Sequence, residues 1–153
     1  MAYLLHVDIP RVAMALKVLM ASILASTLVL GIWFIFVDVE GAIVLFALTV
    51  FDALLFKAVI PRRYEIWSES LRIVLGGPLA VNIALRNIAE ARAVAGEKAY
   101  VYWGVRLATT NRGVVEIVRR RGLNVVISPS DRETFLQRLS QALEAAPTSG
   151  RVV

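Results

Sequence analysis

The chain has 153 residues, of which 58% are hydrophobic and only 19% are charged, and its mean hydropathy is +0.69. Ordinary soluble domains contain roughly 45–50% apolar and about 25% charged residues, so this composition excludes a plain soluble domain and a disordered chain. The formal net charge of +5 is compatible with binding to any polyanion. Because the chain has no cysteine and only one histidine, His6, it has no disulfide, thiol nucleophile or multi-histidine metal site.

Two stretches with almost no charge dominate the first 61 residues. Residues 18–37 carry no charged side chain, and residues 41–60 carry only Asp52 and Lys57. At about 1.5 Å per residue, each stretch makes a helix long enough to cross a hydrocarbon core of about 30 Å. Neither shows the polar stripe of a helix in a soluble bundle. We therefore predict that residues 1–61 form an N-terminal segment followed by a two-helix transmembrane hairpin.

The connection between the two spans predicts the topology of the hairpin. It is so short that the helices run antiparallel and both chain ends lie on the same side. The connection carries acids only, at Asp38 and Glu40. Basic residues flank the outer ends of the spans, namely Arg11, Lys17, Arg62 and Arg63. This positive-inside bias predicts a multi-pass protein of the cytoplasmic (inner) membrane, with both termini in the cytoplasm and membrane lipids around the hairpin.

Asp52 is the one charge well inside a span, which makes it a candidate intramembrane polar site. Counted from a hairpin centre near Val39, Ser26 lies at the same depth on the first helix, and Ser22 and Thr27 lie within a turn of it. Two interpretations stay open. Either Asp52 accepts hydrogen bonds from this hydroxyl patch in a closely packed hairpin, or it relays a proton or ion within a membrane complex.

Residues 62–145 are predicted to form a second, cytoplasmic domain, which carries all of the chain's net positive charge. Its apolar residues recur with a period of two, which is typical of half-buried strands, and Gly, Pro and Asn residues separate the runs. The expected strands cover residues 63–67, 71–75, 79–85, 88–94, 101–107, 114–119 and 123–128.

A helical period follows the last strand, over residues 135–143, and residues 146–153 have the composition of a flexible tail. Ser130 and Glu133 have the spacing of a capping box at the start of this helix. The fold class predicted is thus a membrane α-hairpin plus an all-β domain. About seven antiparallel strands form a barrel or sandwich with one C-terminal α-helix.

The stretch from Tyr64 to Leu143 resembles the bacterial and archaeal pleckstrin-homology-like (PH-like, bPH) domain. The motifs that carry the resemblance are Gly113-Val-Val-Glu-Ile and Gly122-Leu-Asn-Val-Val-Ile-Ser-Pro-Ser-Asp-Arg-Glu-Thr-Phe-Leu. Members of this family often follow a two-helix membrane hairpin. The resemblance implies two nearly orthogonal antiparallel sheets closed by a C-terminal helix, and a binding or scaffolding role without a defined substrate.

Arg119, Arg120 and Arg121 form the densest cluster of charge in the chain. The resemblance places them near Arg86 at the open end of the domain, where four guanidinium groups form an anion-binding or partner-binding rim. A solvated turn is the alternative. The loop after the first strand contains Glu69 and lacks the basic residues of phosphoinositide-binding relatives. We therefore expect the rim to face a partner rather than the bilayer.

Nothing in the sequence points to catalysis. It contains no nucleotide-binding or serine-hydrolase motif, and His6 lies before the first span, apart from the serines of the β-domain. We predict a protein that is not an enzyme and that has no catalytic residues, metal or cofactor. Tyr102 and Trp103 are adjacent in an expected strand and face opposite sides, which argues against base stacking and a nucleic-acid partner.

The favoured function is a membrane-anchored interaction or scaffolding module that binds a protein partner or a second copy of itself. Two alternatives stay open. One is an accessory subunit of a membrane transport or secretion complex that uses Asp52. The other is a binder of anionic lipid or nucleic acid that uses the arginine rim.

Overall fold

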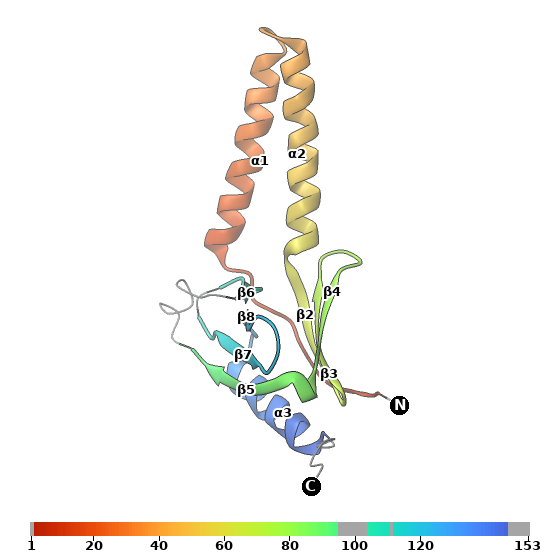
Figure 1. The fold of residues 1–153 in the computed structure, drawn as a ribbon. Helices are drawn as coiled ribbons and strands as arrows, with labels where there is room; N and C mark the ends of the chain where they lie inside the picture. Colours follow the sequence, from red (N-terminus) through yellow and green to blue (C-terminus); the bar gives the residue numbers. More distant parts are fainter. Residues whose placement is uncertain (1, 95–103, 111, 147–153) are drawn as a thin grey trace.

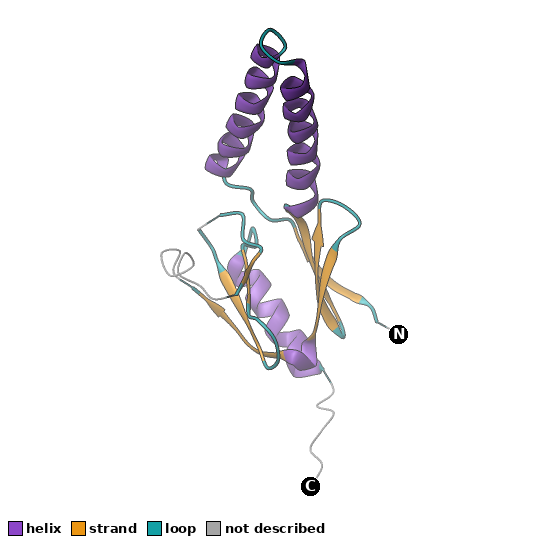
Figure 2. Cartoon of the chain, turned by 45° about the horizontal axis from the view of Figure 1, so that its top comes forward, coloured by secondary structure: helices purple, strands orange, loops and turns teal. Residues whose placement is uncertain are grey.

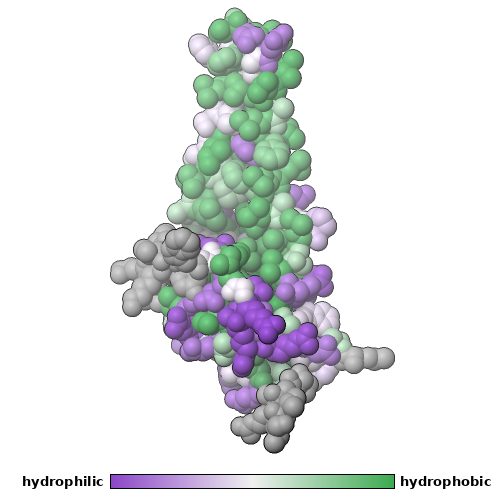
Figure 3. All heavy atoms as spheres, in the orientation of Figure 1, coloured by the Kyte–Doolittle hydropathy of each residue, from purple (hydrophilic) through white to green (hydrophobic). Residues whose placement is uncertain are grey.

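The computed structural model describes residues 2–94, 104–110 and 112–146. Two long helices stand on a β-domain, which a C-terminal helix completes (Figures 1 and 2). The long helices are α1 (Met14–Phe34) and α2 (Val39–Val59), of 21 residues each. Both are long and apolar enough to cross a membrane. Figure 3 shows that apolar side chains cover the helices, whereas hydrophilic side chains gather over the sheets.

The two helices begin and end a few residues earlier than the spans predicted at 18–37 and 41–60. At the hairpin turn, Asp38 explains why α2 starts earlier than predicted. Its carboxylate accepts hydrogen bonds from the backbone N–H groups of Glu40 (3.1 Å) and Gly41 (3.2 Å), so α2 starts at Val39. Residues 35–37 form the turn instead of a last helical turn.

The helices pack along a seam of side chains spaced three and four residues apart, as in left-handed helix pairs. On α1 the buried and half-buried positions of this seam are Met20, Leu24, Thr27, Gly31 and Phe34. The hydroxyl groups of Thr27 and Thr49 are hydrogen bonded across it at 3.0 Å. Gly31 admits the Phe46 ring, since a Cβ at Gly31 would lie 3.2 Å from that ring. These two contacts set the register of the hairpin.

The β-domain consists of two four-stranded sheets. The first has the order β1 (Leu4–Asp8), β2 (Pro61–Trp67), β3 (Ser70–Leu75), β4 (Ala80–Ala84). The second has the order β5 (Ile88–Ala93), β7 (Val115–Arg119), β8 (Val125–Ile127), β6 (Val105–Arg106). A short 3-10 helix, η1 (Leu85–Asn87), connects the sheets, and α3 (Arg132–Ala145) follows β8.

Three features of this topology differ from the prediction. β1 is an unpredicted strand, whose antiparallel partner β2 lies beyond the whole hairpin in sequence. The pairing of β6 with β8 is parallel, so the domain is not purely antiparallel. Among the described residues the two sheets do not close into a barrel, because β1 and β4 are edges of one sheet and β5 and β6 are edges of the other. Six of the seven predicted strands recur with similar bounds. Of the seventh, predicted at residues 101–107, the structure describes only β6 as a strand, and residues 101–103 lie outside the described residues.

One core holds the two sheets and α3 together. Both sheets and α3 contribute large apolar side chains that water does not reach, such as Ile66 from β2, Ile117 from β7 and Phe135 from α3. Tyr64 lies in the middle, where its hydroxyl donates to the carbonyl oxygen of Leu107 (3.1 Å). Burial raises the pKa of Tyr64 to about 12. The buried phenol thus remains a neutral hydrogen-bond donor.

α3 begins one residue later than the predicted capping box. Asp131 is its N-cap, and the carboxylate accepts hydrogen bonds from the backbone N–H (3.2 Å) and the hydroxyl (2.7 Å) of Thr134. These side-chain and backbone hydrogen bonds lower the pKa of Asp131. Ser130 does not cap the helix because its hydroxyl donates to Asp8 of β1 instead, at 3.0 Å.

The turn between β3 and β4 docks on the end of α2. A Cβ at Gly76 would overlap the backbone carbonyl oxygen of Lys57, and one at Gly77 would make an ordinary contact with Ala58 at 3.9 Å. Figure 1 shows this turn beside the base of α2. The β-domain therefore contacts the hairpin both through its chain connections and through a direct backbone approach that only glycine permits.

Candidate functional site

The predicted rim belongs to η1 and to the turn between β7 and β8, which lie at the end of the sheets away from the long helices (Figure 1). β2 starts directly after α2 and runs away from it for seven residues, about 20 Å at about 3.3 Å per residue. At the far end, Leu85 of η1 donates its backbone N–H to the Glu69 carbonyl oxygen (2.9 Å). The backbone N–H of Arg120 donates to the carbonyl oxygen of Asn87 (2.7 Å), which brings the turn after β7 to the same end.

Three of the four predicted arginines line one hollow, which we call the arginine hollow. Arg86, Arg120 and Arg121 surround it together with Ala84 and Asn87, and its volume is about 490 Å³. Arg86 comes from η1, and the other two come from the turn between β7 and β8. The structure thus brings together side chains more than 30 residues apart in sequence.

Asn87 positions the turn that carries Arg120 and Arg121. Its side-chain Oδ1 accepts a hydrogen bond from the backbone N–H of Arg121 (3.0 Å), and its Nδ2 donates to the Arg121 carbonyl oxygen (3.1 Å). An amide side chain supplies both a donor and an acceptor, so it pairs with a backbone segment as a strand would. The sequence analysis missed Asn87, and its only sequence signal is its place directly after Arg86.

The arginine hollow is a site of uncompensated positive charge. Within the part of the chain that the structure describes, the guanidinium groups of Arg86, Arg120 and Arg121 make no hydrogen bond or ion pair. Like charges in one hollow repel each other, and a bound anion removes that repulsion. The planar guanidinium group fits carboxylate and phosphate oxygens in a two-pronged geometry. The hollow can therefore take an acidic group.

Arg119 does not share the hollow. Its side chain lies over Gly122, whose Cβ would meet the guanidinium carbon at 3.3 Å, and its Nη1 donates to the Leu123 carbonyl oxygen at 3.4 Å. Gly122 has a φ of +90°, which turns the chain back beneath this side chain. Arg119 thus packs on the turn, and the cluster of four arginines predicted from the sequence is a cluster of three.

A larger groove adjoins the arginine hollow. Its volume is about 740 Å³, and it shares Ala84 and Arg86 with the hollow. Its apolar walls come from Leu5 of β1 and Ala142 of α3, Arg138 adds a second cation, and Glu69 adds one carboxylate. A segment with acidic and apolar side chains can therefore contact both surfaces at once.

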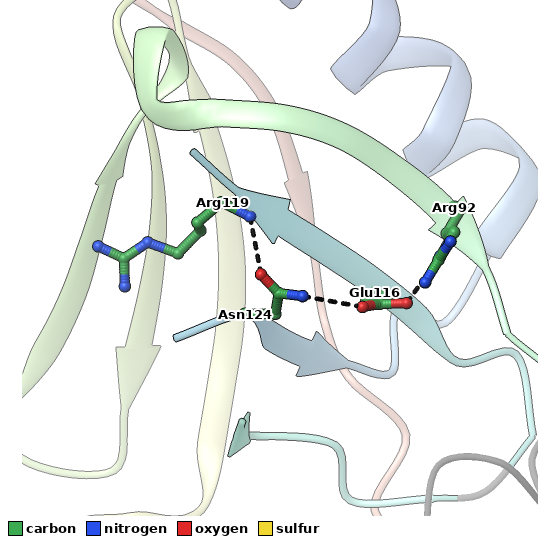
Figure 4. Close-up of polar contacts among 4 residues, drawn as sticks. All are labelled: Arg92, Glu116, Arg119 and Asn124. Carbon is green, nitrogen blue, oxygen red and sulfur yellow. Dashed lines mark hydrogen bonds and ion pairs between the residues drawn. The ribbon is translucent and has the colours of Figure 1, made fainter. Parts of the chain in front are cut away.

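A buried carboxylate supports the turn from the inside (Figure 4). Glu116 of β7 is 1% exposed and pairs with Arg92 of β5, Oε2 to Nε, at 2.7 Å. Its other oxygen accepts from Nδ2 of Asn124 (3.1 Å), whose Oδ1 in turn accepts from the backbone N–H of Arg119 (3.0 Å). This chain of contacts joins β5, β7 and the residue just before β8. Buried networks of this kind rigidify the segments that they connect.

Asp52 lies on the helix seam, but the predicted serines do not. Because Thr49 faces Thr27, the half-buried Asp52 faces Leu24 one turn closer to the β-domain. Ser22 and Ser26 lie on the exposed side of α1, and the hydroxyl of Ser26 donates to the Ile23 carbonyl oxygen (2.9 Å). The prediction that Ser26 lies at the depth of Asp52 was wrong, because the turn between the helices lies at residues 35–38. At their positions along α1, both serines face away from α2. No hydrogen bond reaches Asp52 from the described residues.

Asp52→Leu is expected to raise the free energy of unfolding by about 1 kcal/mol, because it exchanges an unpartnered carboxyl group in the seam for an apolar side chain that packs on Leu24. Thermal unfolding in detergent micelles measures this effect. Ser22→Leu, on the exposed side of α1, is the matched control and should leave the midpoint unchanged. A lower midpoint for Asp52→Leu would show that the carboxyl group has a stabilising partner.

The structure corrects the position of His6. The sequence analysis separated this residue from the β-domain, but it belongs to β1 and pairs with Ile66 of β2. Two residues further along β1, Asp8 is buried and binds the start of α3. Tyr102 and Trp103 lie outside the described residues. Within the described ranges, no three histidine or acidic side chains converge as a metal site.

We compared the chain with models of protein families, with curated proteins and with solved structures, and no significant match was found in any of the three. The functional assignment therefore depends on the geometry of the site.

Proposed function

We propose that this chain is a membrane-anchored, non-catalytic interaction module that binds an acidic segment of a protein partner at the arginine hollow. The observation that carries this proposal is the convergence of Arg86, Arg120 and Arg121, without acidic partners in the described residues, on the face opposite the long helices. The adjoining groove supplies apolar contact area beside the cations. Charge and apolar area together favour a peptide segment over a free small anion.

The orientation in the membrane follows from charge. The outer ends of α1 and α2 carry Arg11, Lys17, Arg62 and Arg63, whereas the hairpin turn carries acids. In the proposed topology both helices cross the cytoplasmic membrane, and the β-domain lies in the cytoplasm with both termini. The proposed bPH likeness is supported by the two four-stranded sheets and C-terminal helix, although the sheets do not close.

The distance between the hollow and the bilayer argues for a protein partner. The hollow lies one strand length, about 20 Å, from the end of α2. Screening at physiological ionic strength reduces electrostatic attraction over about 8 Å, so anionic headgroups of the anchoring membrane contribute little at that distance. A second copy of the chain is an alternative occupant, and nucleic acid is disfavoured by the apolar groove beside the cations.

The double variant Arg120→Gln, Arg121→Gln is expected to lose the partner. Removing two of three guanidinium groups should weaken an interface of charge-assisted hydrogen bonds at least about tenfold. The measurement is extraction of the native complex in a mild detergent, followed by size determination and mass spectrometry of the proteins that accompany the chain.

The matched control is Arg72→Gln, Arg112→Gln, which removes the same charge from exposed positions outside the hollow. This control should retain the partner. If both double variants retain the same partner, the hollow is a solvated turn. If the chain accompanies only further copies of itself, and this association is lost in the first variant alone, the hollow binds a second copy.

A second candidate function is supported by one observation, the half-buried Asp52 in the helix seam without a partner in the described residues. Intramembrane carboxyl groups often belong to proton or ion pathways, which would suit an accessory subunit of a transport or secretion complex. The Asp52→Leu variant distinguishes the two functions. An interaction module should keep its partner and its biological activity, whereas a relay should keep its partner and lose activity.

A further inference from the structure

The turn between β3 and β4 lies at the opposite end of the β-domain from the arginine hollow. Gly76 abuts the backbone carbonyl of Lys57, and Gly77 lies beside Ala58, so the turn reaches the level of the last helical turn of α2 (Figures 1 and 2). α2 ends at Val59, and its 21 residues match the thickness of a hydrocarbon core. A turn beside Ala58 therefore lies at the level of the membrane boundary.

The composition of this segment suits that location. Residues 73–85 contain no charged side chain, although the turn that joins β3 to β4 is exposed. Within the turn, Gly77 and Pro78 are exposed, and Leu79 is 53% exposed despite its apolar side chain. A single exposed leucine is common in turns of soluble domains, but here it lies in an uncharged stretch beside the end of an apolar helix, where an apolar side chain can contact lipid.

We propose that the turn at residues 76–79 inserts into the cytoplasmic headgroup layer of the bilayer that holds the hairpin, with Leu79 in contact with the acyl chains. This inference rests on the membrane anchoring in the proposed function. The occupant is the lipid bilayer because the turn is continuous with the exposed apolar surface of α2, whose last turn it touches. An apolar side chain at the headgroup boundary gains from burial in the acyl region.

This contact would orient the β-domain. The two chain connections and the hydrogen bonds of Thr109 to Arg11 and Ala13 already attach it to the hairpin, and an inserted turn adds an attachment on the β3–β4 side. Each further attachment restricts the tilting of the domain relative to the hairpin. The arginine hollow, at the far end of β2, is then held toward the cytoplasm and away from anionic headgroups.

The natural chain has no cysteine, so single-cysteine variants can carry an environment-sensitive nitrobenzoxadiazole (NBD) label at one position. The experiment places Leu79→Cys in vesicles of phosphatidylcholine and phosphatidylglycerol, with or without doxyl-labelled lipid as a quencher. Leu123→Cys is the matched control, because Leu123 is 59% exposed in the turn that follows Arg121, at the opposite end. Val50→Cys, 61% exposed in the middle of α2, reports membrane anchoring itself.

The expected result is quenching at positions 50 and 79, with at least about a twofold greater loss of fluorescence at 79 than at 123. Quenching at 50 but not at 79 would overturn the insertion of the turn and leave the anchoring intact. Equal quenching at 79 and 123 would also overturn it, because the domain would then lie on its side. Absence of quenching at 50 would overturn the membrane anchoring and, with it, both proposals.

Discussion

Gly76→Ala is expected to destabilise the protein by about 3 kcal/mol, the upper part of the range for overpacking a tightly packed site. The added Cβ would overlap the backbone carbonyl oxygen of Lys57, and a backbone group cannot rotate away as a flexible side chain can. The β3–β4 turn would have to leave the end of α2. Thermal unfolding in detergent micelles, together with limited proteolysis of the turn, measures the effect.

Gly77→Ala is the matched control, because it adds the same atom one residue later. That Cβ would make only ordinary contacts with Ala58 at 3.9 Å, and the backbone of Gly77 does not have positive φ. We expect a change within about 0.5 kcal/mol. If Gly76→Ala behaved like Gly77→Ala, the turn would not dock on α2, and the orientation inferred for the β-domain would lose its basis.

Asp8→Ala is expected to have the other large effect, a loss of about 2–4 kcal/mol. Asp8 is only 5% exposed, and its carboxylate accepts hydrogen bonds from the backbone N–H of Ser130 (2.7 Å), the hydroxyl of Ser130 (3.0 Å) and the backbone N–H of Asp131 (3.3 Å). Alanine leaves all three donors without an acceptor. Chemical denaturation followed by circular dichroism measures the loss.

Two further variants separate the hydrogen bonds of Asp8 from general effects of losing a carboxylate. Asp8→Asn keeps one acceptor oxygen and should recover part of the stability, whereas Glu144→Ala removes an exposed carboxylate from α3 and should have almost no effect. Equal stability of Asp8→Ala and Glu144→Ala would mean that β1 does not hold α3 through this side chain.

The sequence alone determined the parts that local patterns encode. Apolar runs of about 20 residues require helices of membrane length, and alternation with a period of two indicated most of the strands. The sequence also predicted a helix after the last strand, because the spacing of apolar residues near Phe135 is that of a helix. It singled out Arg86, Arg120 and Arg121, which the structure brings into one hollow.

Local sequence patterns could not predict which residues of the two long helices lie opposite each other. The side chain of Asp38 ends the turn and starts α2, and this single cap shifts the depth at which residues of the two helices meet. A shift of two residues also changes the face of a helix that a side chain occupies. Ser22 and Ser26 consequently face outward while Asp52 faces the seam.

Only the tertiary structure decided the contacts between distant segments. β1 is five residues long and pairs with a strand on the other side of the hairpin, so neither its length nor its neighbours in sequence reveal it. Asp8 and Asn87 act on backbone groups 34 or more residues away. Such polar contacts depend on chain segments meeting in space, whereas helices and strands follow from the periodicity of burial along a single segment.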